Sequence, residues 1–442
     1  MAQDETRNPE TTHCRGPAPE CSVPKVECRD SSNATDSVEK QTNDEGRDIL
    51  VTSEHLVRSA LLTSVLKITW QDEATDPGNP RNWPLGRRAK ALIAMSSCVF
   101  ISVFSTSMIA PNLPAIANTT LLDDVMQEDP TTNLFQERIA ELTGKEAALL
   151  VSSGTMGNQI SLRTALKVPP YSILCDARGH ILHMEAGGAA TLWGALVEGV
   201  LPSNGHHLTL ADVQKSAILR EGVYDCPTRV ISLENTLSGT IMPLSEMQAI
   251  SSWARSRKPP IHMHLDGARL WEFVSSGAGS LKEGAELFDS ITMCFTKGLG
   301  APIGSIIIGT SAFIQQARWV RKLIGGGMRQ TGVIAAPARV AVEDVFLGNK
   351  LKRAQEVAKF IADAWVRLGG KLTKPTETNM VWLDLEAAGI YPPAFAKMTH
   401  DAGLKTMKGR LENRLIVHYQ ISQDAVNTLV QLFYLIMDEK AF

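Results

Sequence analysis

The most informative segment of the chain is Asp289-Ser-Ile-Thr-Met-Cys-Phe-Thr-Lys297-Gly-Leu-Gly-Ala-Pro-Ile-Gly304, which the apolar run Ser305-Ile-Ile-Ile308 follows. The pattern predicts a mostly apolar strand, then a glycine-rich turn that contains Lys297, and then a second strand. Earlier in the chain, Ile261-His-Met-His-Leu-Asp266 predicts a short strand that ends in a carboxylate. Pyridoxal phosphate needs such a pair, because the lysine forms a Schiff base with its aldehyde and the carboxylate keeps its pyridinium nitrogen protonated.

A lysine beside glycines is more often a solvated turn residue, because loops are polar and exposed. Lys297 therefore proves little by itself. The strand-end carboxylate of Asp266, together with Thr296, Gly298 and Gly300 around the lysine, makes a cofactor site the better interpretation.

Composition narrows the class of protein. At 442 residues the chain can hold a large core and more than one domain. Its formal net charge of -3 predicts no nucleic-acid or anionic-membrane partner. The seven cysteines show no C-x-x-C spacing, so neither a disulfide framework nor a zinc site is expected. A reducing, cytoplasmic location fits this pattern best.

The amino-terminal part differs from the rest. Residues 1–80 are polar and are expected to be mostly disordered. Within 81–120, the apolar run 91–110 with basic residues before it predicts either a membrane helix or a buried soluble helix. Residues 76–114 also resemble the entry to the first membrane helix of fungal major facilitator drug transporters. Membrane anchoring through 91–110 is therefore the alternative to a cytoplasmic location, although one span excludes transport as the function.

From residue 121 onward the composition is that of a soluble α/β protein. A helical pattern at 133–142 alternates with short apolar runs at 147–151, 230–233, 261–265 and 303–308. Alternating helices and strands predict a mostly parallel sheet, with ligands bound at the carboxyl ends of its strands.

Other segments offer candidate ligand groups. Gly154 and Thr155 stand where a strand turns into a helix, and backbone amides at such a helix start can hold a phosphate. His180 could stack on a pyridine ring or handle protons, with His183 as the neighbour most easily confused with it. The remaining candidates are arginines: Arg269 and Arg414 for a substrate carboxylate, and Arg329, after three glycines, for the phosphate.

These motifs, in this order, resemble the threonine aldolase and β-eliminating lyase family of fold type I pyridoxal-phosphate enzymes. The matching segments are 123–131, 153–158, 180–188, 233–236, 264–269, 297–304 and 325–330. The resemblance implies a large cofactor-binding domain over 121–335, with a mostly parallel sheet, and a smaller α+β domain over 336–442. It also implies a small amino acid as substrate and a homodimer or homotetramer with sites completed across the interface.

The same resemblance assigns roles to residues. Lys297 is then the Schiff-base lysine and Asp266 the partner of the pyridinium. His180 stacks on the ring, and Gly154 and Thr155 bind the phosphate. Arg269 and Arg414 bind the substrate carboxylate.

Three departures from the family pattern bear on activity. The usual amino-terminal Ser-Asp-Thr segment is replaced by the transporter-like helix, Tyr-Gly-Glu-Asp-Pro reads Met126-Gln-Glu-Asp-Pro130, and Leu237 replaces a histidine near the substrate hydroxyl. Retro-aldol cleavage of threonine needs a base for that hydroxyl, whereas racemisation of alanine needs only proton exchange at Cα. Leu237 cannot accept the hydroxyl proton, so His180, or a water molecule that it orients, is the expected acceptor. On the family resemblance, the favoured interpretation is an aldolase that cleaves threonine or a related β-hydroxy-α-amino acid. An alanine racemase of the same fold and an inactive fusion product remain alternatives.

Overall fold

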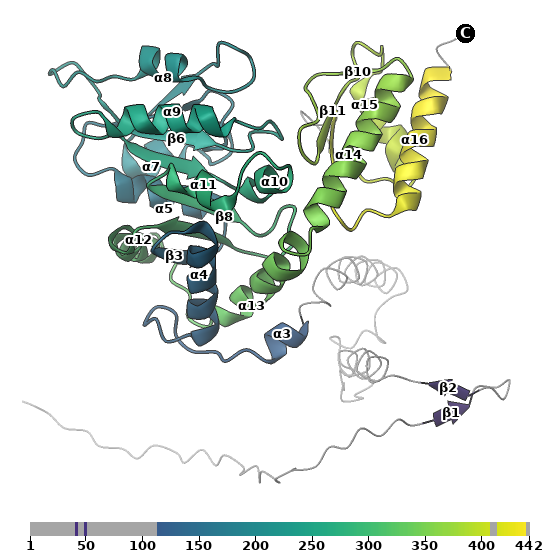
Figure 1. The fold of residues 1–442 in the computed structure, drawn as a ribbon, viewed down its shortest axis with the longest axis horizontal. Coiled ribbons are helices and arrows are strands. Elements are labelled where there is room, and N and C mark those ends of the chain that lie inside the picture. The colour runs from purple at the N-terminus through teal and green to yellow at the C-terminus, as the bar shows by residue number, and fades with distance from the viewer. Residues whose placement is uncertain (1–39, 43–47, 51–112, 407–412, 439–442) are drawn as a thin grey trace, which may run out of the picture. The chain divides into compact units, whose positions relative to one another are not determined.

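The structure is a computed structural model that describes residues 40–42, 48–50, 113–406 and 413–438. Its centre is a seven-stranded sheet in the order β3-β9-β8-β7-β6-β4-β5 (Figure 1). The strands are β3 (Ala147–Val151), β4 (Ser172–Asp176), β5 (Leu196–Val200), β6 (Thr228–Glu234), β7 (His262–Asp266), β8 (Ser290–Cys294) and β9 (Ser305–Gly309). The pairs from β5 to β8 are parallel, while β9 runs antiparallel to both of its neighbours, β8 and β3.

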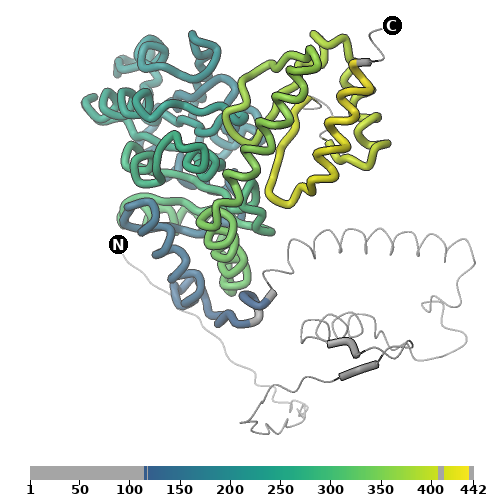
Figure 2. Tube along the Cα trace, turned by 45° about the vertical axis from the view of Figure 1, so that its right-hand side comes forward, coloured from purple at the N-terminus to yellow at the C-terminus, as the bar shows by residue number. Residues whose placement is uncertain are grey.

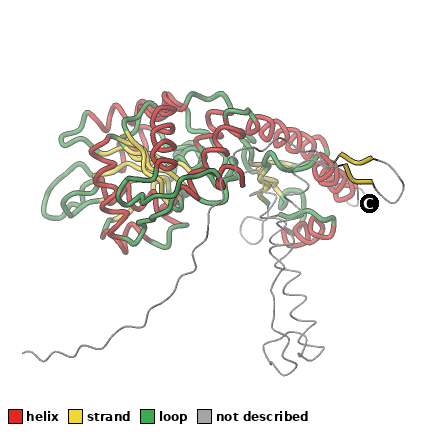
Figure 3. The backbone as a smooth tube through the Cα atoms, turned by 90° about the horizontal axis from the view of Figure 1, so that it is seen from below, coloured by secondary structure: helices red, strands yellow, loops and turns green. Residues whose placement is uncertain are grey.

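Apart from the edge strand β5, the sheet is buried on both faces, which explains its apolar runs. In β9, Ile306 and Ile308 pack into one core and Ile307 into another, because successive side chains of a strand point to opposite faces. One core includes residues of α4 (Pro130–Thr143) and α9 (Leu244–Arg255), and the other includes residues of α5 (Gly154–Ala165) and α12 (Ser311–Leu323). Figure 3 shows the strands between these layers of helices. The mostly parallel sheet expected from the sequence is confirmed.

A second, smaller sheet follows in the chain. The helices α13 (Gly332–Ala341), η3 (Val342–Phe346) and α14 (Lys350–Arg367) lead to it from the large sheet (Figure 2). Its antiparallel strands are β10 (Lys371–Leu372), β11 (Met380–Asp384) and β12 (Arg414–Ile416). With α14, α15 (Pro392–Asp401) and α16 (Gln423–Asp438) they enclose a separate core. The predicted boundary after residue 335 falls inside α13, and the division into two domains stays a prediction.

Little of the amino-terminal part belongs to the described chain. It contains the antiparallel pair β1 (Lys40–Thr42) and β2 (Asp48–Leu50), followed much later by α3 (Leu113–Ala117). The expected apolar helix at 91–110 and most of the expected disorder in 1–80 lie outside the described residues. Among the helices that are described, none combines the length and the apolarity needed to cross a bilayer.

Candidate active site

Three carboxylates end neighbouring strands at one edge of the large sheet. Asp176, Glu234 and Asp266 are the last residues of β4, β6 and β7, and Glu234 lies opposite Asp266 in the β6–β7 register. Parallel strands bring their carboxyl ends to the same edge, which is where ligands bind in such sheets. Asp266 is buried, and its Oδ1 accepts a hydrogen bond from the backbone N–H of Ala268 at 3.1 Å.

Asn158, on the second turn of α5, joins this edge to the helix. Its Nδ2 donates to Oδ2 of Asp266 at 2.7 Å and to Oε1 of Glu185 at 2.8 Å. Its Oδ1 lies 3.2 Å from Nε2 of His264. Burial lowers the pKa of His264 to about 3, so its ring is neutral and donates one N–H to the amide oxygen. Sequence reasoning missed Asn158, because an asparagine inside a helix carries no local signal of such a role.

His180, at the start of α6 (His180–His183), faces the same cluster. Its Nδ1 lies 2.8 Å from Oε1 of Glu185, and its backbone N–H donates to Oε2 of Glu234 at 2.8 Å. The hydrogen bond to Glu185 raises the pKa of His180, and the nearby Asp266 adds to the effect, while burial opposes it. His183 instead points its Nε2 at the backbone oxygen of Ala177 at 2.6 Å and is exposed. Of the two histidines, His180 is therefore the one at the strand ends.

The ligand atoms of His180, Glu185 and Asp266 lie within 4.8 Å of one another, close enough to surround a cation. The Asn158 amide already bridges the two carboxylates, and Gln159 donates to the second oxygen of Glu185 at 2.6 Å. A cation would have to displace these donors. The arrangement therefore fits an organic group that presents its own N–H to Asp266 better than it fits a metal.

Lys297 follows β8 and lies in the turn before β9. Its Nζ approaches Sγ of Cys294 at 3.4 Å, and Oγ of Ser305 donates to the same sulfur at 3.2 Å. The turn closes through a hydrogen bond from the Gly300 N–H to the Lys297 carbonyl at 3.0 Å. Gly300 has a φ of +73°, a conformation that glycine adopts without strain. The charge of Lys297 slightly opposes the rise in the pKa of His180.

The amino end of α5 lies directly above Cys294. Ser153 caps the helix, since its Oγ accepts from the Met156 N–H at 3.1 Å. A Cβ on Gly154 would come within 2.7 Å of Sγ of Cys294, so this turn has room only for glycine. Gly154 thus lies beside Cys294, the residue that the Lys297 side chain contacts, and the binding of a phosphate by Gly154 and Thr155 stays a prediction. The unpaired N–H groups and the dipole of a helix start favour an anion there.

The two arginines predicted to bind a carboxylate also approach each other. Arg269 precedes α10 (Leu270–Ser275), and Arg414 is the first residue of β12, where its guanidinium lies 5.6 Å from the ring centroid of Trp382. Burial lowers the pKa of Arg414, and the charge of Arg269 lowers it further. Within the described residues, the buried Nε of Arg414 has no hydrogen-bond partner. A carboxylate between the two guanidiniums would supply one.

Arg329 has a different environment. Its side chain is 72% exposed, and its Nη1 lies 2.7 Å from Oδ2 of Asp123. In the described part of the chain no contact joins it to Gly154 or Thr155. Its predicted role in phosphate binding therefore stays a prediction.

Leu237, which replaces the histidine common in the family, is buried and forms a bridge with Thr240. The adjacent Ser238 carbonyl accepts from Nε1 of Trp382 at 2.9 Å. A cavity of about 20 Å³ is lined by Leu237, Glu234, His207 and neighbours. That volume suffices for one water molecule.

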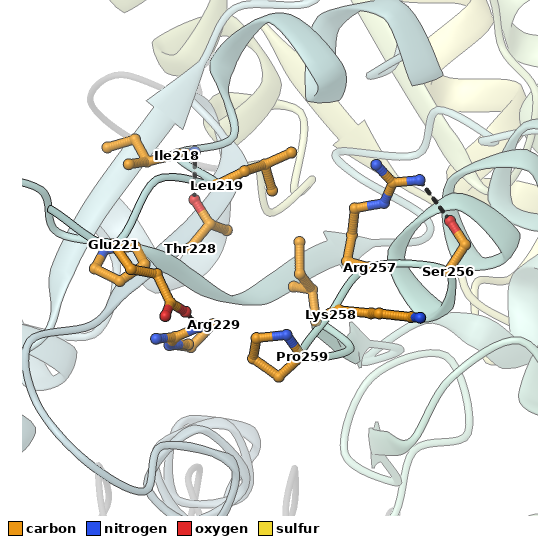
Figure 4. Close-up of a pocket in the computed structure, with 11 residues that line it drawn as sticks. Ile218, Leu219, Glu221, Thr228, Arg229, Ser256, Arg257, Lys258 and Pro259 are labelled. Carbon is orange, nitrogen blue, oxygen red and sulfur yellow. Dashed lines mark hydrogen bonds and ion pairs between the residues drawn. The ribbon is translucent and has the colours of Figure 1, made fainter.

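A larger cavity, of about 300 Å³, lies at the amino ends of β6 and β7, opposite the strand-end carboxylates (Figure 4). Two of its arginines already have partners: Arg229 pairs with Glu221 at 2.8 Å, and Arg257 donates to Ser256 at 2.7 Å. We therefore assign no chemistry to it.

Comparison with known proteins agrees with this geometry. The model of the beta-eliminating lyase family matches residues 109–388. Aldolase vrtJ of Penicillium aethiopicum is 52% identical over 320 residues, which are 72% of this chain and 81% of that protein. The alanine racemase TOXG of Cochliobolus carbonum is 42% identical over 343 residues, 76% of this chain and 87% of that protein. A low-specificity L-threonine aldolase of Eremothecium gossypii is 42% identical over 320 residues, 72% of this chain and 82% of that protein.

The fold is also similar to that of a solved threonine aldolase. The structure of a threonine aldolase from Leishmania major superposes with a TM-score of 0.62 at 19% identity, covering 74% of this chain and 96% of that one. The fold type I architecture expected from the sequence is confirmed. The chain is thus an enzyme of the beta-eliminating lyase family.

Proposed function

We propose that this protein is a pyridoxal-phosphate-dependent aldolase that cleaves L-threonine, or a related β-hydroxy-α-amino acid, to glycine and an aldehyde. The observation that carries the proposal is the meeting of Asp266, His180 and Lys297 beside the amino end of α5. The likeness to an aldolase and to an L-threonine aldolase supports it further.

The site fits the cofactor in two respects. Oδ2 of Asp266 lies beside the Asn158 amide at a sheet edge, where it can also accept from a pyridinium N–H. Gly154 and Thr155 begin α5, and the backbone N–H groups at such a helix start can hold a phosphate. When bound, pyridoxal phosphate supplies an electron sink for the pair released at Cα of the substrate.

The substrate carboxylate is proposed to bind between Arg269 and Arg414. Arginine presents a planar fork that suits bidentate binding of a carboxylate, and the two guanidiniums come from different parts of the chain. Burial, and to a lesser degree the charge of Arg269, lowers the pKa of Arg414, so its charged form is unfavourable there without an anion. An amino-acid carboxylate stabilises that charged form and so gains binding free energy from it.

The proton of the substrate hydroxyl needs an acceptor, and Leu237 cannot provide one. His180 is the candidate: Nδ1 faces the Glu185 carboxylate, which leaves Nε2 as the ring nitrogen that can hold or move a proton. A water molecule oriented by His180 can extend its reach. The His180 pKa, raised by Glu185, suits a group that exchanges protons near neutral pH.

Racemisation of alanine is the second candidate, favoured by the likeness to TOXG and by the absence of a histidine at position 237. It would use the same lysine and arginines but requires no hydroxyl acceptor. We propose the aldolase first, because the relatives named aldolases include the one at 52% identity.

The test is to incubate purified protein and cofactor with L-threonine or L-alanine and to assay glycine, acetaldehyde and D-alanine. Glycine with acetaldehyde supports the aldolase, and D-alanine alone supports the racemase. No product from either substrate, with Lys297→Ala as the blank, favours an inactive fusion. We also propose a homodimer or homotetramer in the cytoplasm, which sedimentation and carbonate-washed cell fractionation can check.

A further inference from the structure

One buried acid beside the proposed site has no part in the chemistry described so far. Glu272 lies in the first turn of α10 and is 1% exposed. Its Oε2 accepts from Nε2 of Gln355, on α14, at 2.7 Å, and the same amide donates to the Glu272 carbonyl at 2.9 Å. Its Oε1 is buried without a hydrogen-bond partner among the described residues. An orphan carboxyl oxygen in a core needs an explanation, because it costs free energy.

The orphan oxygen is packed against the backbone that carries Lys297. A Cβ built on Gly298 would collide with Oε1 of Glu272 and would come within 3.0 Å of Cδ2 of Leu351, on α14. The carboxyl therefore fills the space under the peptide between Lys297 and Gly298. The turn has a second close neighbour, because the Tyr419 hydroxyl would lie 3.1 Å from a Cβ on Gly300. The turn that carries Lys297 is therefore packed closely against Glu272 and Tyr419.

The surroundings of Glu272 favour its neutral form. Burial raises the pKa of Glu272 to about 7, while the Gln355 hydrogen bond and the charge of Arg269 hold it from rising further. The turn contributes the glycine backbone and α14 contributes the neutral Gln355 and Leu351. Among the described residues, Arg269 is thus the side chain whose charge lowers the pKa of Glu272.

We infer that Glu272 is a positioning residue, which as a neutral carboxylic acid holds the Lys297 turn in place and releases it when its proton is lost to solvent. An ionised Oε1 cannot stay against Gly298 without a donor. It must either turn towards Arg269 or admit water, and both moves open the packing beneath Lys297. The inference rests on the proposed function, in which Lys297 carries the cofactor.

The test compares Glu272→Gln with the wild type. Glutamine has the same size and still offers an oxygen to Gln355, but it does not ionise. We expect the visible absorption band of the Lys297-bound cofactor to fall with rising pH in the wild type around pH 7, and this transition to be absent in Glu272→Gln. Glu356→Gln, an exposed position on α14 next to Gln355, is the control and should follow the wild type. A wild-type profile in Glu272→Gln would overturn the inference.

A second variant keeps the test decisive if Glu272→Gln folds poorly. Gln355→Met removes the donor that stabilises the ionised form, so the transition should move to higher pH. A shift to lower pH, or none, would contradict the inference. Infrared difference spectra of cofactor-free protein should show a protonated-carboxyl band that Glu272→Gln lacks. If the wild type shows no visible band, the proposed function fails, while presence or absence of the infrared band still decides the state of Glu272.

Discussion

Replacing Asn158 by alanine tests the network that holds the carboxylates of Asp266 and Glu185 in place. Asn158 makes hydrogen bonds to Asp266, Glu185 and His264 at 2.7, 2.8 and 3.2 Å. A bond to a charged group contributes about 1.5–3 kcal/mol, and a buried group left without a partner costs about 1–3 kcal/mol. Both carboxylates keep another donor, from Ala268 and from His180 or Gln159, so the lower ends apply. We therefore expect Asn158→Ala to lower the free energy of unfolding by about 4 kcal/mol.

The assay is urea unfolding of the cofactor-free protein, followed by tryptophan fluorescence. Asn427→Ala, at an exposed position on α16, is the control and should change the free energy of unfolding by less than about 0.5 kcal/mol. Asn158→Asp should destabilise more than Asn158→Ala, because it adds a carboxylate beside two others and removes their donor. A loss below about 1 kcal/mol in Asn158→Ala, or a milder effect of Asn158→Asp, would refute the reasoning.

Three further predictions concern packing and ionisation. Gly157→Ala should destabilise by about 1–2 kcal/mol, since its Cβ would collide with Cγ2 of Thr292, and Thr292→Ser should restore most of the loss in chemical unfolding. The pKa of His180, measured by NMR, should lie above its usual value and should fall in Glu185→Gln; an unchanged value would remove Glu185 as its cause. The pKa of Glu272 is raised from 4.5 to about 7 on folding, so its stabilising contribution is present below pH 4.5 and is lost as pH rises to 7. The free energy of unfolding of the wild type relative to Glu272→Gln should therefore fall by about 3 kcal/mol over that range, and a flat difference would contradict it.

The site residues that could be predicted from the sequence are those that lie at or just after the end of a strand. Lys297 and Asp266 follow apolar runs, and parallel strands place such residues at one edge whatever the rest of the chain does. The predicted strand bounds were close to the observed ones but not identical. Strand β9 begins at Ser305 and not at 303, because Gly304 has a φ of +113° and still belongs to the turn.

The supporting residues could not be predicted in this way. Asn158 and Glu272 lie inside helices, where their types carry no signal of a role, and their partners are distant in sequence. The contact between Glu272 and Gly298 depends on how α10 packs on the lysine turn, which only the folded chain determines. The glycine-rich motif before Arg329 predicted phosphate binding, and that role stays a prediction, because the structure pairs the exposed Arg329 with Asp123.

The central claim is that Lys297 carries pyridoxal phosphate. The most direct measurement is borohydride reduction of the protein with its cofactor, followed by peptide mapping of the pyridoxyl group. We expect the pyridoxyl group on the peptide that contains Lys297, and we expect Lys297→Ala to take up no label and to have no activity. A label on another lysine, or a Lys297→Ala protein that stays yellow and active, would contradict it.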